Sequence, residues 1–196
     1  MFKYYLLHKP FGFLSQFSKD HPNQKTLADL MPDIDKDVYP LGRLDKDSEG
    51  LLLLTSNRRL NQRLLHPNQK HLRTYHLQVE GAPTKEDLSP LLAGVMFRAK
   101  KKSHLGKFHS IEHLQPYPYA DRKPPIRFRK DIPETGLRVT LEEGKNRQVR
   151  KMMAAIGFPV LRLIRYSIEE ITIQDLPLGH HKEVSESFFL SKLKLD

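Results

Sequence analysis

The chain has 196 residues, of which 38% are hydrophobic, enough for one substantial globular domain. It contains no cysteine, which excludes a disulfide framework, a thiolate zinc site and a thiol nucleophile, and no apolar stretch approaches the length of a membrane span. The 33 Lys and Arg against 23 Asp and Glu give a formal charge of +10, which favours a phosphate-bearing partner without defining an activity.

Hydrophobic periodicity predicts mainly strands. Apolar and polar residues alternate at 5–7, 72–79, 137–141 and 168–173, the pattern of half-buried strands. Four consecutive leucines at 51–54 predict a strand that is buried on both faces, although a helix is not excluded by periodicity alone.

Two helices are predicted in the first half of the chain. One covers residues 60–65 and ends before Pro67, which cannot continue a helix. The other begins near Thr84, but Pro90 falls where it should continue, so this helix is either kinked or begins at Ser89.

The strongest helical pattern lies at 146–156, where apolar side chains recur at i, i+3, i+4 and i+7 and a glycine at 157 can close the C-terminus. The apolar positions are Val149, Met152, Met153 and Ile156. Many strands, few helices and no regular alternation between them predict an α+β fold, with a mainly antiparallel mixed sheet flanked by helices and basic loops. With no linker-like tract, residues 1–196 are expected to form a single domain.

Two long stretches, 98–107 and 116–133, are expected to be irregular, and both are basic. Each can be a solvated loop or a surface that contacts RNA. The second interleaves three aromatic residues with five Lys and Arg, the composition that binds phosphates and stacks on unpaired bases, so we interpret it as RNA-facing. For the first stretch both interpretations stay open.

The segment 42–50, Gly-Arg-Leu-Asp-Lys-Asp-Ser-Glu-Gly, joins a charged loop to the leucine strand. A carboxylate at such a junction can be partly shielded from water and influenced by a nearby cation. An ordinary turn with an exposed pair of Arg43 and Asp45 is the alternative, and composition alone favours it.

A resemblance favours the chemical interpretation. Residues 42–45, followed by Gly-Leu-Leu-Leu-Leu-Thr at 50–55, resemble the active-site signature of pseudouridine synthases. His-Lys-Pro-Phe-Gly-Phe-Leu-Ser at 8–15 and the segment 143–165 are similar to motifs of the branch that acts on ribosomal RNA, and 124–133 is similar to a stretch found among its large-subunit enzymes. Many relatives carry an N-terminal S4 domain, for which this chain leaves no room, so RNA docking is expected to fall to the catalytic domain.

The resemblance implies roles for particular residues. Asp45 matches the catalytic aspartate, Tyr75 the tyrosine that packs on the target base, and Arg150 the basic residue that pairs with the aspartate. Without the resemblance, Tyr75 would be a half-buried strand aromatic and Arg150 a solvated helix arginine. The residues expected to bind RNA are Lys9, Arg43, Arg127, Arg129, Lys130, Lys145, Arg147 and Gln148.

The implied function is isomerisation of one uridine of 23S ribosomal RNA, free or in precursor particles, by a cytoplasmic monomer that needs no metal, cofactor or membrane. The alternative is a non-catalytic ribosomal-RNA-binding or ribosome-assembly protein on the same fold. A DNA-binding regulator would require a helix-turn-helix, which the pattern lacks. His109 and His113 have the spacing of a helical metal-ligand pair, but the residues around them lack helical periodicity.

Overall fold

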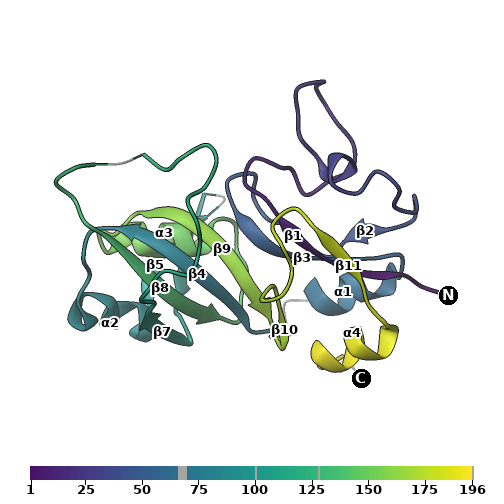
Figure 1. Cartoon of the computed structure of the whole chain (residues 1–196). Helices are drawn as coiled ribbons and strands as arrows, with labels where there is room; N and C mark the ends of the chain where they lie inside the picture. Colours follow the sequence, from purple (N-terminus) through teal and green to yellow (C-terminus); the bar gives the residue numbers. More distant parts are fainter. Residues whose placement is uncertain (66–69, 100, 128, 196) are drawn as a thin grey trace. The chain divides into compact units, whose positions relative to one another are not determined.

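A computed structural model describes residues 1–65, 70–99, 101–127 and 129–195 (Figure 1). The chain divides into two units: Met1–His71 with Ile164–Asp196 form unit 1, and Leu72–Leu163 form unit 2. Strands and helices are mixed in both, and most strand pairs are antiparallel, which confirms the predicted α+β class. Among the described residues, no helix has both the length and the apolar character needed to cross a membrane.

Unit 1 is built on a sheet with the strand order β11, β1, β3, β9. The pairs β11·β1 and β1·β3 are antiparallel, whereas β3·β9 is parallel. β2 pairs with β3, and β10 pairs with β9. The strands are β1 (Tyr4–Lys9), β2 (Tyr39–Pro40), β3 (Glu49–Thr55), β9 (Val160–Ile168, which enters from unit 2), β10 (Ile171–Thr172) and β11 (His181–Glu183); the helices are the 3-10 turn η1 (Leu27–Asp29), α1 (Arg59–Leu65) and α4 (Glu186–Lys192).

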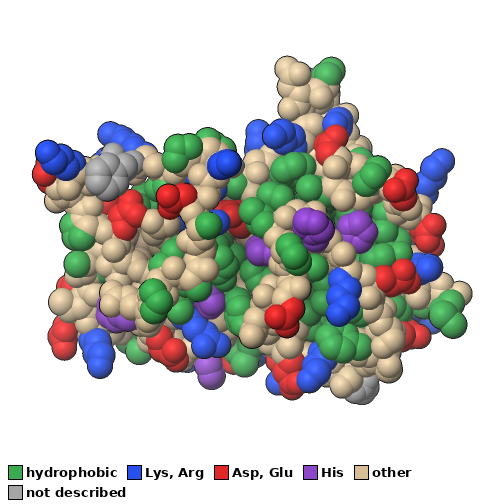
Figure 2. Space-filling view, viewed as in Figure 1, with side chains coloured by type: hydrophobic (Ala, Val, Ile, Leu, Met, Phe, Trp, Pro, Cys, Tyr) green, Lys and Arg blue, Asp and Glu red, His purple; other side chains and the backbone are tan. Residues whose placement is uncertain are grey.

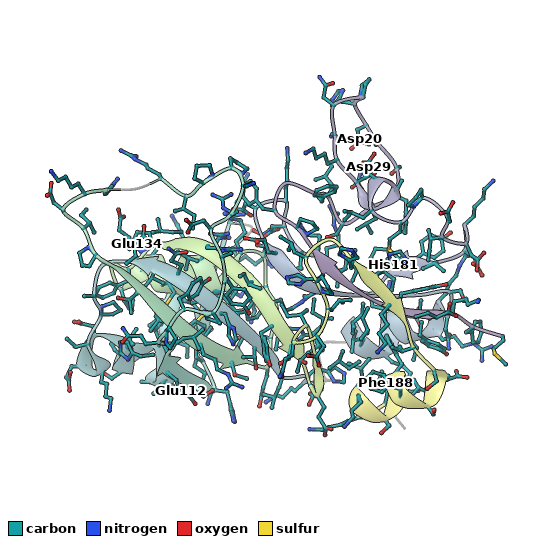
Figure 3. All side chains as sticks on the ribbon, viewed as in Figure 1. Asp20, Asp29, Glu112, Glu134, His181 and Phe188 are labelled. Carbon is teal, nitrogen blue, oxygen red and sulfur yellow. The ribbon has the colours of Figure 1, made fainter. Side chains whose placement is uncertain are left out.

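The leucine run forms β3, and all seven residues of this strand are buried. The prediction of a strand covered on both faces is therefore confirmed. Burial of four leucines at about 1.5–3 kcal/mol each makes β3 a main source of stability for unit 1. The loop that follows Ser15 leaves this core and carries η1; Figure 3 labels Asp20 and Asp29 on it.

Unit 2 contains a three-stranded antiparallel sheet in the order β4, β8, β7. A separate hairpin, β5·β6, and two helices complete it. The elements are β4 (Arg73–Glu80), α2 (Lys85–Ala93), β5 (Val95–Ala99), β6 (Lys102–Gly106), β7 (Ser110–His113), β8 (Glu134–Leu141) and α3 (Gln148–Ala155). Met152 and Met153 of α3 are fully buried in the core of this unit, as the helical pattern predicts.

Helix α3 ends as its sequence indicates. Gly157 adopts a φ of 88°, its N–H donates to the carbonyl of Ala154 at 3.1 Å, and the N–H of Phe158 donates to Met153 at 3.1 Å. These two bonds define a Schellman C-cap, which requires a positive φ that glycine adopts without strain. The helix begins at Gln148 rather than at 146 because Arg147 has a φ of 52°, outside the helical region.

Helix α2 begins at Lys85 with Thr84 as its N-cap, so the alternative start at Ser89 is wrong. The helix continues through Pro90 because the carbonyl of Glu86, which a proline cannot bond, accepts the hydroxyl of Ser89 at 2.8 Å. The predicted helix at 60–65 is also confirmed as α1, while Pro67 lies outside the described residues.

Two predictions about strands need correction. Residues 98–107 are not irregular: most of them belong to the hairpin β5·β6, whose turn includes Lys101 at a φ of 64°, the left-handed conformation of tight hairpin turns. Residues 168–173 are not one strand, because Glu169, at a φ of 48°, turns the chain and Ile171 pairs back with Ile168. Residues 110–113 form a strand, so His109 and His113 do not share a helix.

Candidate functional site

The loop that carries Asp45 in unit 1 is hydrogen-bonded at two points to residues 8–15, which we call the first motif. The N–H of Gly12 donates to the carbonyl of Lys46 at 2.8 Å. The hydroxyl of Ser15 donates to the carbonyl of Leu44 at 2.8 Å and accepts the N–H of Leu44 at 3.0 Å. Asp45 is exposed, and its own carbonyl closes a turn with the N–H of Ser48. The side chain of Asp45 is therefore exposed while the backbone that carries it is held in place.

Lys9, at the end of β1, is fully buried. Its ammonium donates to the carbonyls of Pro10 at 3.0 Å and Phe13 at 2.8 Å. Burial lowers the pKa of Lys9 to about 8, and the negative charges of Glu49 and Asp47 partly oppose this shift. With its hydrogen bonds directed at the first motif, Lys9 is placed to hold that motif's turn.

The start of β3 requires a glycine at position 50. Gly50 has a φ of +108°, and a Cβ there would lie 2.3 Å from the carbonyl oxygen of Arg165 on β9. Gly50 also pairs with Lys9 on β1, so two buried cations flank the glycine across the sheet. The guanidinium of Arg165 donates to the carbonyl of Leu51 at 2.7 Å and so adds a further tie between β9 and β3.

Unit 2 holds the other two residues expected to be catalytic. Tyr75, on β4, is 8% exposed and belongs to the core of the unit. Arg150, on α3, is half-buried and donates to the carbonyl of Val160 at 2.8 Å. Each side chain is thus held by a regular element and has limited freedom.

The turn before α3 is held by its own side chains. Gln148, 3% exposed, accepts the N–H of Lys145 at 3.1 Å and donates to the carboxylate of Glu143 at 3.1 Å. Lys145 also forms an ion pair with Glu143. Arg147 remains exposed at the N-cap. Three residues of this turn are predicted to bind RNA: Lys145, Arg147 and Gln148. Of these, Arg147 is the exposed cation, while Gln148 shapes the turn.

The long basic stretch of unit 2 is irregular, as predicted: the described residues of 116–133 include no helix or strand. It is anchored near both ends, because Tyr119 bonds to His76 at 2.8 Å and Arg129 forms an ion pair with Glu80 at 2.9 Å. Arg162 adds a bond to the carbonyl of Ala120 at 2.7 Å. In Figure 2, Lys and Arg side chains gather over this loop at the upper left of the view.

Burial lowers the pKa of His76 to about 4, and the positive charge of Arg138 acts in the same direction. His76 is therefore neutral at pH 7, and its ring can form the hydrogen bond with the hydroxyl of Tyr119 without a buried charge. In the part of the chain that the structure describes, no three His, Asp or Glu side chains gather in a way that could hold a metal ion.

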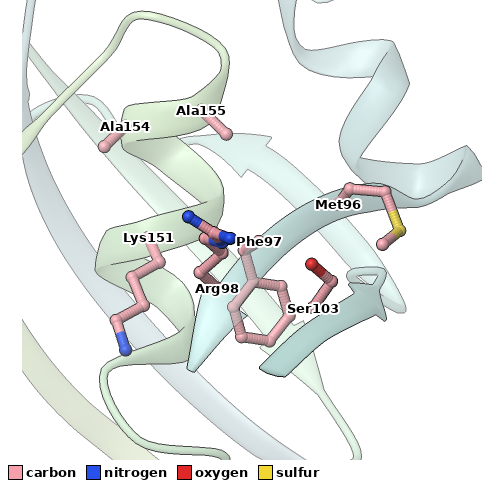
Figure 4. Close-up of a pocket in the computed structure, with 7 residues that line it drawn as sticks. All are labelled: Met96, Phe97, Arg98, Ser103, Lys151, Ala154 and Ala155. Atoms are coloured by element: carbon pink, nitrogen blue, oxygen red, sulfur yellow. The ribbon is translucent and has the colours of Figure 1, made fainter. Parts of the chain in front are cut away.

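The sequence did not predict a cavity in either unit, and the structure has one in each. In unit 2, a hollow of about 460 Å³ lies between α3 and the β5·β6 hairpin, with Arg98 and Lys151 on its wall (Figure 4). In unit 1, a larger cavity of about 870 Å³ is lined by Tyr39, Arg43 and Arg58 among others. Tyr39 and Arg58 were missed because a single aromatic and a single arginine carry no periodic signal.

The chain belongs to the family of RNA pseudouridylate synthases, which its sequence matches over residues 3–155. It is 48% identical to ribosomal large subunit pseudouridine synthase E of Vibrio vulnificus (strain CMCP6), over 93% of this chain and 75% of the relative. The enzyme of the same name from Xanthomonas axonopodis pv. citri is 46% identical over 83% of this chain and 84% of the relative. The predicted resemblance to the large-subunit enzymes of this family is confirmed.

A solved structure described as a pseudouridylate synthase has the same fold. It superposes with a TM-score of 0.73 over 98% of this chain and 74% of that structure, at 22% sequence identity.

Proposed function

We propose that this chain converts a uridine of 23S ribosomal RNA into pseudouridine, with Asp45 as the catalytic carboxylate. Membership of the family and the 46–48% identity to large-subunit synthases E support the reaction and the substrate class. The observation that carries the choice of Asp45 is its geometry: an exposed carboxylate on a backbone that Gly12 and Ser15 hold in place.

The reaction breaks the bond between C1′ of the ribose and N1 of uracil, turns the base and joins C1′ to C5. N1 gains a proton and C5 loses one, so no redox partner or group donor is needed. In the proposal, Asp45 acts at the ribose or the base, Arg150 keeps the carboxylate ionised, and Tyr75 packs on the uracil. Residues 1–196 act together as one catalytic domain that needs no cofactor or metal.

RNA is held by the exposed cations at Arg43, Arg127, Lys130 and Arg147, with Arg129 and Lys145 adding charge beside their intramolecular partners. Lys9 and Gln148 contribute from within, because their buried side chains shape the loops that meet the RNA. The enzyme acts in the cytoplasm. It acts as a monomer, because its substrate is much larger than itself and no second copy is needed to enlarge the binding surface.

The test is release of tritium from 23S ribosomal RNA labelled at uridine C5. We expect wild-type protein to release tritium and Asp45→Asn to release none while its RNA affinity stays within a few-fold of wild type. Asp175→Asn, an exposed carboxylate of the same unit, is the matched control and should release tritium normally. Equal release by Asp45→Asn and wild type would remove Asp45 from the chemistry. No release by wild type from naked RNA or precursor particles, with binding intact, would overturn the enzymatic function.

A further inference from the structure

The cavity of unit 1 is lined by residues from the end of the first motif, from β2 and from the start of α1. Its volume of about 870 Å³ is within the range of about 300–1,000 Å³ typical of small-molecule sites. Two arginines and no acidic residue line it.

An exposed aromatic ring forms part of its wall. Tyr39 is 45% exposed, although its neighbour Val38 is buried in the core. Arg58 holds the ring in place: its guanidinium carbon lies 5.2 Å from the ring centroid, and its terminal nitrogen donates to the Tyr39 hydroxyl at 3.3 Å. A fixed aromatic ring beside a guanidinium plane is the arrangement on which unpaired bases stack.

The cavity also offers hydrogen-bond donors that the protein does not use. Within the described residues, neither the Arg43 guanidinium nor the Asn61 side-chain amide has a hydrogen-bond partner, and both line the cavity. Asp29, on the loop between Ser18 and β2, does not line the cavity, and its carboxylate pairs with Lys19 at 2.6 Å and accepts the N–H of Thr26 at 2.8 Å. Figure 3 shows Asp29 on the projecting loop.

We propose that this cavity is a second nucleotide subsite, which takes an unpaired nucleotide next to the target uridine: the base stacks on Tyr39, and Arg43 and Arg58 bind its phosphate. The proposal rests on the proposed function for the identity of the neighbouring nucleotide. Arg43 is two residues from Asp45, a separation of at most about 7 Å along the chain, so an adjoining nucleotide can reach the cavity. Exposed cations and an aromatic ring favour RNA over a protein partner.

The experiment measures binding, so that it does not depend on turnover. A short single-stranded oligouridine with one 2-aminopurine is titrated with Asp45→Asn protein, and the fluorescence of 2-aminopurine falls when it stacks. We expect Tyr39→Ala in this background to weaken binding about 5- to 100-fold and to abolish the quenching, as loss of one stacking platform does. Tyr39→Phe, which keeps the ring, should retain both the quenching and most of the affinity.

Two matched controls separate a subsite from general effects. Phe188→Ala removes another exposed ring of unit 1, and Arg59→Gln removes the charge next to Arg58 that does not line the cavity. Arg58→Gln should weaken binding and flatten its dependence on salt more than Arg59→Gln does. Unchanged affinity and quenching in Tyr39→Ala, or changes no larger than those of Phe188→Ala, would overturn the subsite.

Two further results distinguish other outcomes. If Tyr39→Ala binds the oligonucleotide normally but loses affinity for ribosomal particles, the cavity binds a protein and the nucleotide proposal is wrong. If quenching depends on Tyr39 but wild-type protein never releases tritium, the subsite stands and the proposed catalytic function fails.

Discussion

The hydroxyl of Ser15 both donates to the carbonyl of Leu44 and accepts the N–H of Leu44, at 2.8 and 3.0 Å. One buried side chain thus satisfies both backbone groups of the residue before Asp45 and replaces the strand partner that this loop lacks. The first motif and the aspartate motif, about thirty positions apart in the sequence, form one structural unit through this contact.

Ser15→Ala should therefore lower kcat, and the fall in kcat, expressed as a free energy, should exceed the loss in the free energy of unfolding. Loss of the hydroxyl leaves a buried carbonyl and N–H without their partner, at about 1–3 kcal/mol, and frees the backbone that positions Asp45. The measurement is kcat for uridine conversion together with the free energy of unfolding. Ser187→Ala, on the surface of α4, should alter neither; an unchanged kcat in Ser15→Ala would show that the loop needs no support from Ser15.

Gly50→Ala should prevent folding of unit 1 or cost more than about 4 kcal/mol, because a Cβ would lie 2.3 Å from a backbone oxygen that cannot move away and because φ is +108°. The measurement is soluble yield, followed by urea unfolding of any soluble protein. Gly144→Ala is the control, since the nearest atom to a Cβ there is 4.0 Å away. A stable Gly50→Ala protein would contradict the close pairing of β3 with β9.

The lowered pKa of Lys9 predicts that the stability of the protein rises with pH in the alkaline range. Its pKa is about 8 in the folded chain and 10.5 as the reference value, so between these values the unfolded chain binds a proton that the folded chain does not. The free energy of unfolding should therefore rise with pH across this window, by roughly 3 kcal/mol in all. Below pH 8 the full cost of burying the charge is present.

The contribution is isolated by comparing wild type with Lys9→Met in urea unfolding between pH 8 and 10.5. The difference in unfolding free energy between the two proteins should change with pH, whereas the difference between wild type and Lys36→Met, an exposed lysine, should stay constant. A pH-independent difference for Lys9→Met would mean that Lys9 is not buried as a charged group.

The lowered pKa of His76 predicts a loss of stability at acidic pH. Its pKa is lowered from 6.5 to about 4 by burial, so as the pH falls through this range the unfolded chain gains a proton that the folded chain resists. The wild-type protein should lose roughly 3 kcal/mol between pH 6.5 and 4 that His76→Phe does not lose. Urea unfolding of both proteins at these two pH values measures it, and parallel losses would contradict the burial of His76.

The elements predicted correctly from sequence are those in which burial repeats over several residues. The leucines of β3 and the apolar face of α3 with Gly157 behind it carry such a repeat, and the structure confirms both. The motifs around Asp45 were also visible, because their order and spacing are specific. These features are encoded locally.

The errors arise where one residue changes the direction of the chain. Lys101 and Glu169 lie in hairpin turns and adopt left-handed backbone conformations, which are rare for lysine and glutamate and so cannot be predicted from the residue type. At the start of the 98–107 stretch, the abundance of charge hid the alternation of β5, in which Phe97 and Ala99 are buried while Met96 and Arg98 are exposed. The cavity at Tyr39 was equally hidden, since it depends on how three separate segments of unit 1 come together.

The loop at 116–133 is tied at Tyr119 by His76 and at Arg129 by Glu80. Because both ties are made inside unit 2, part of the conformational entropy that RNA binding would otherwise remove is already lost in the free protein. Preorganisation of this kind lets residues that never touch a nucleotide contribute to affinity. His76 and Glu80, buried or half-buried on β4, would then belong to the thermodynamics of RNA recognition as well as to the fold.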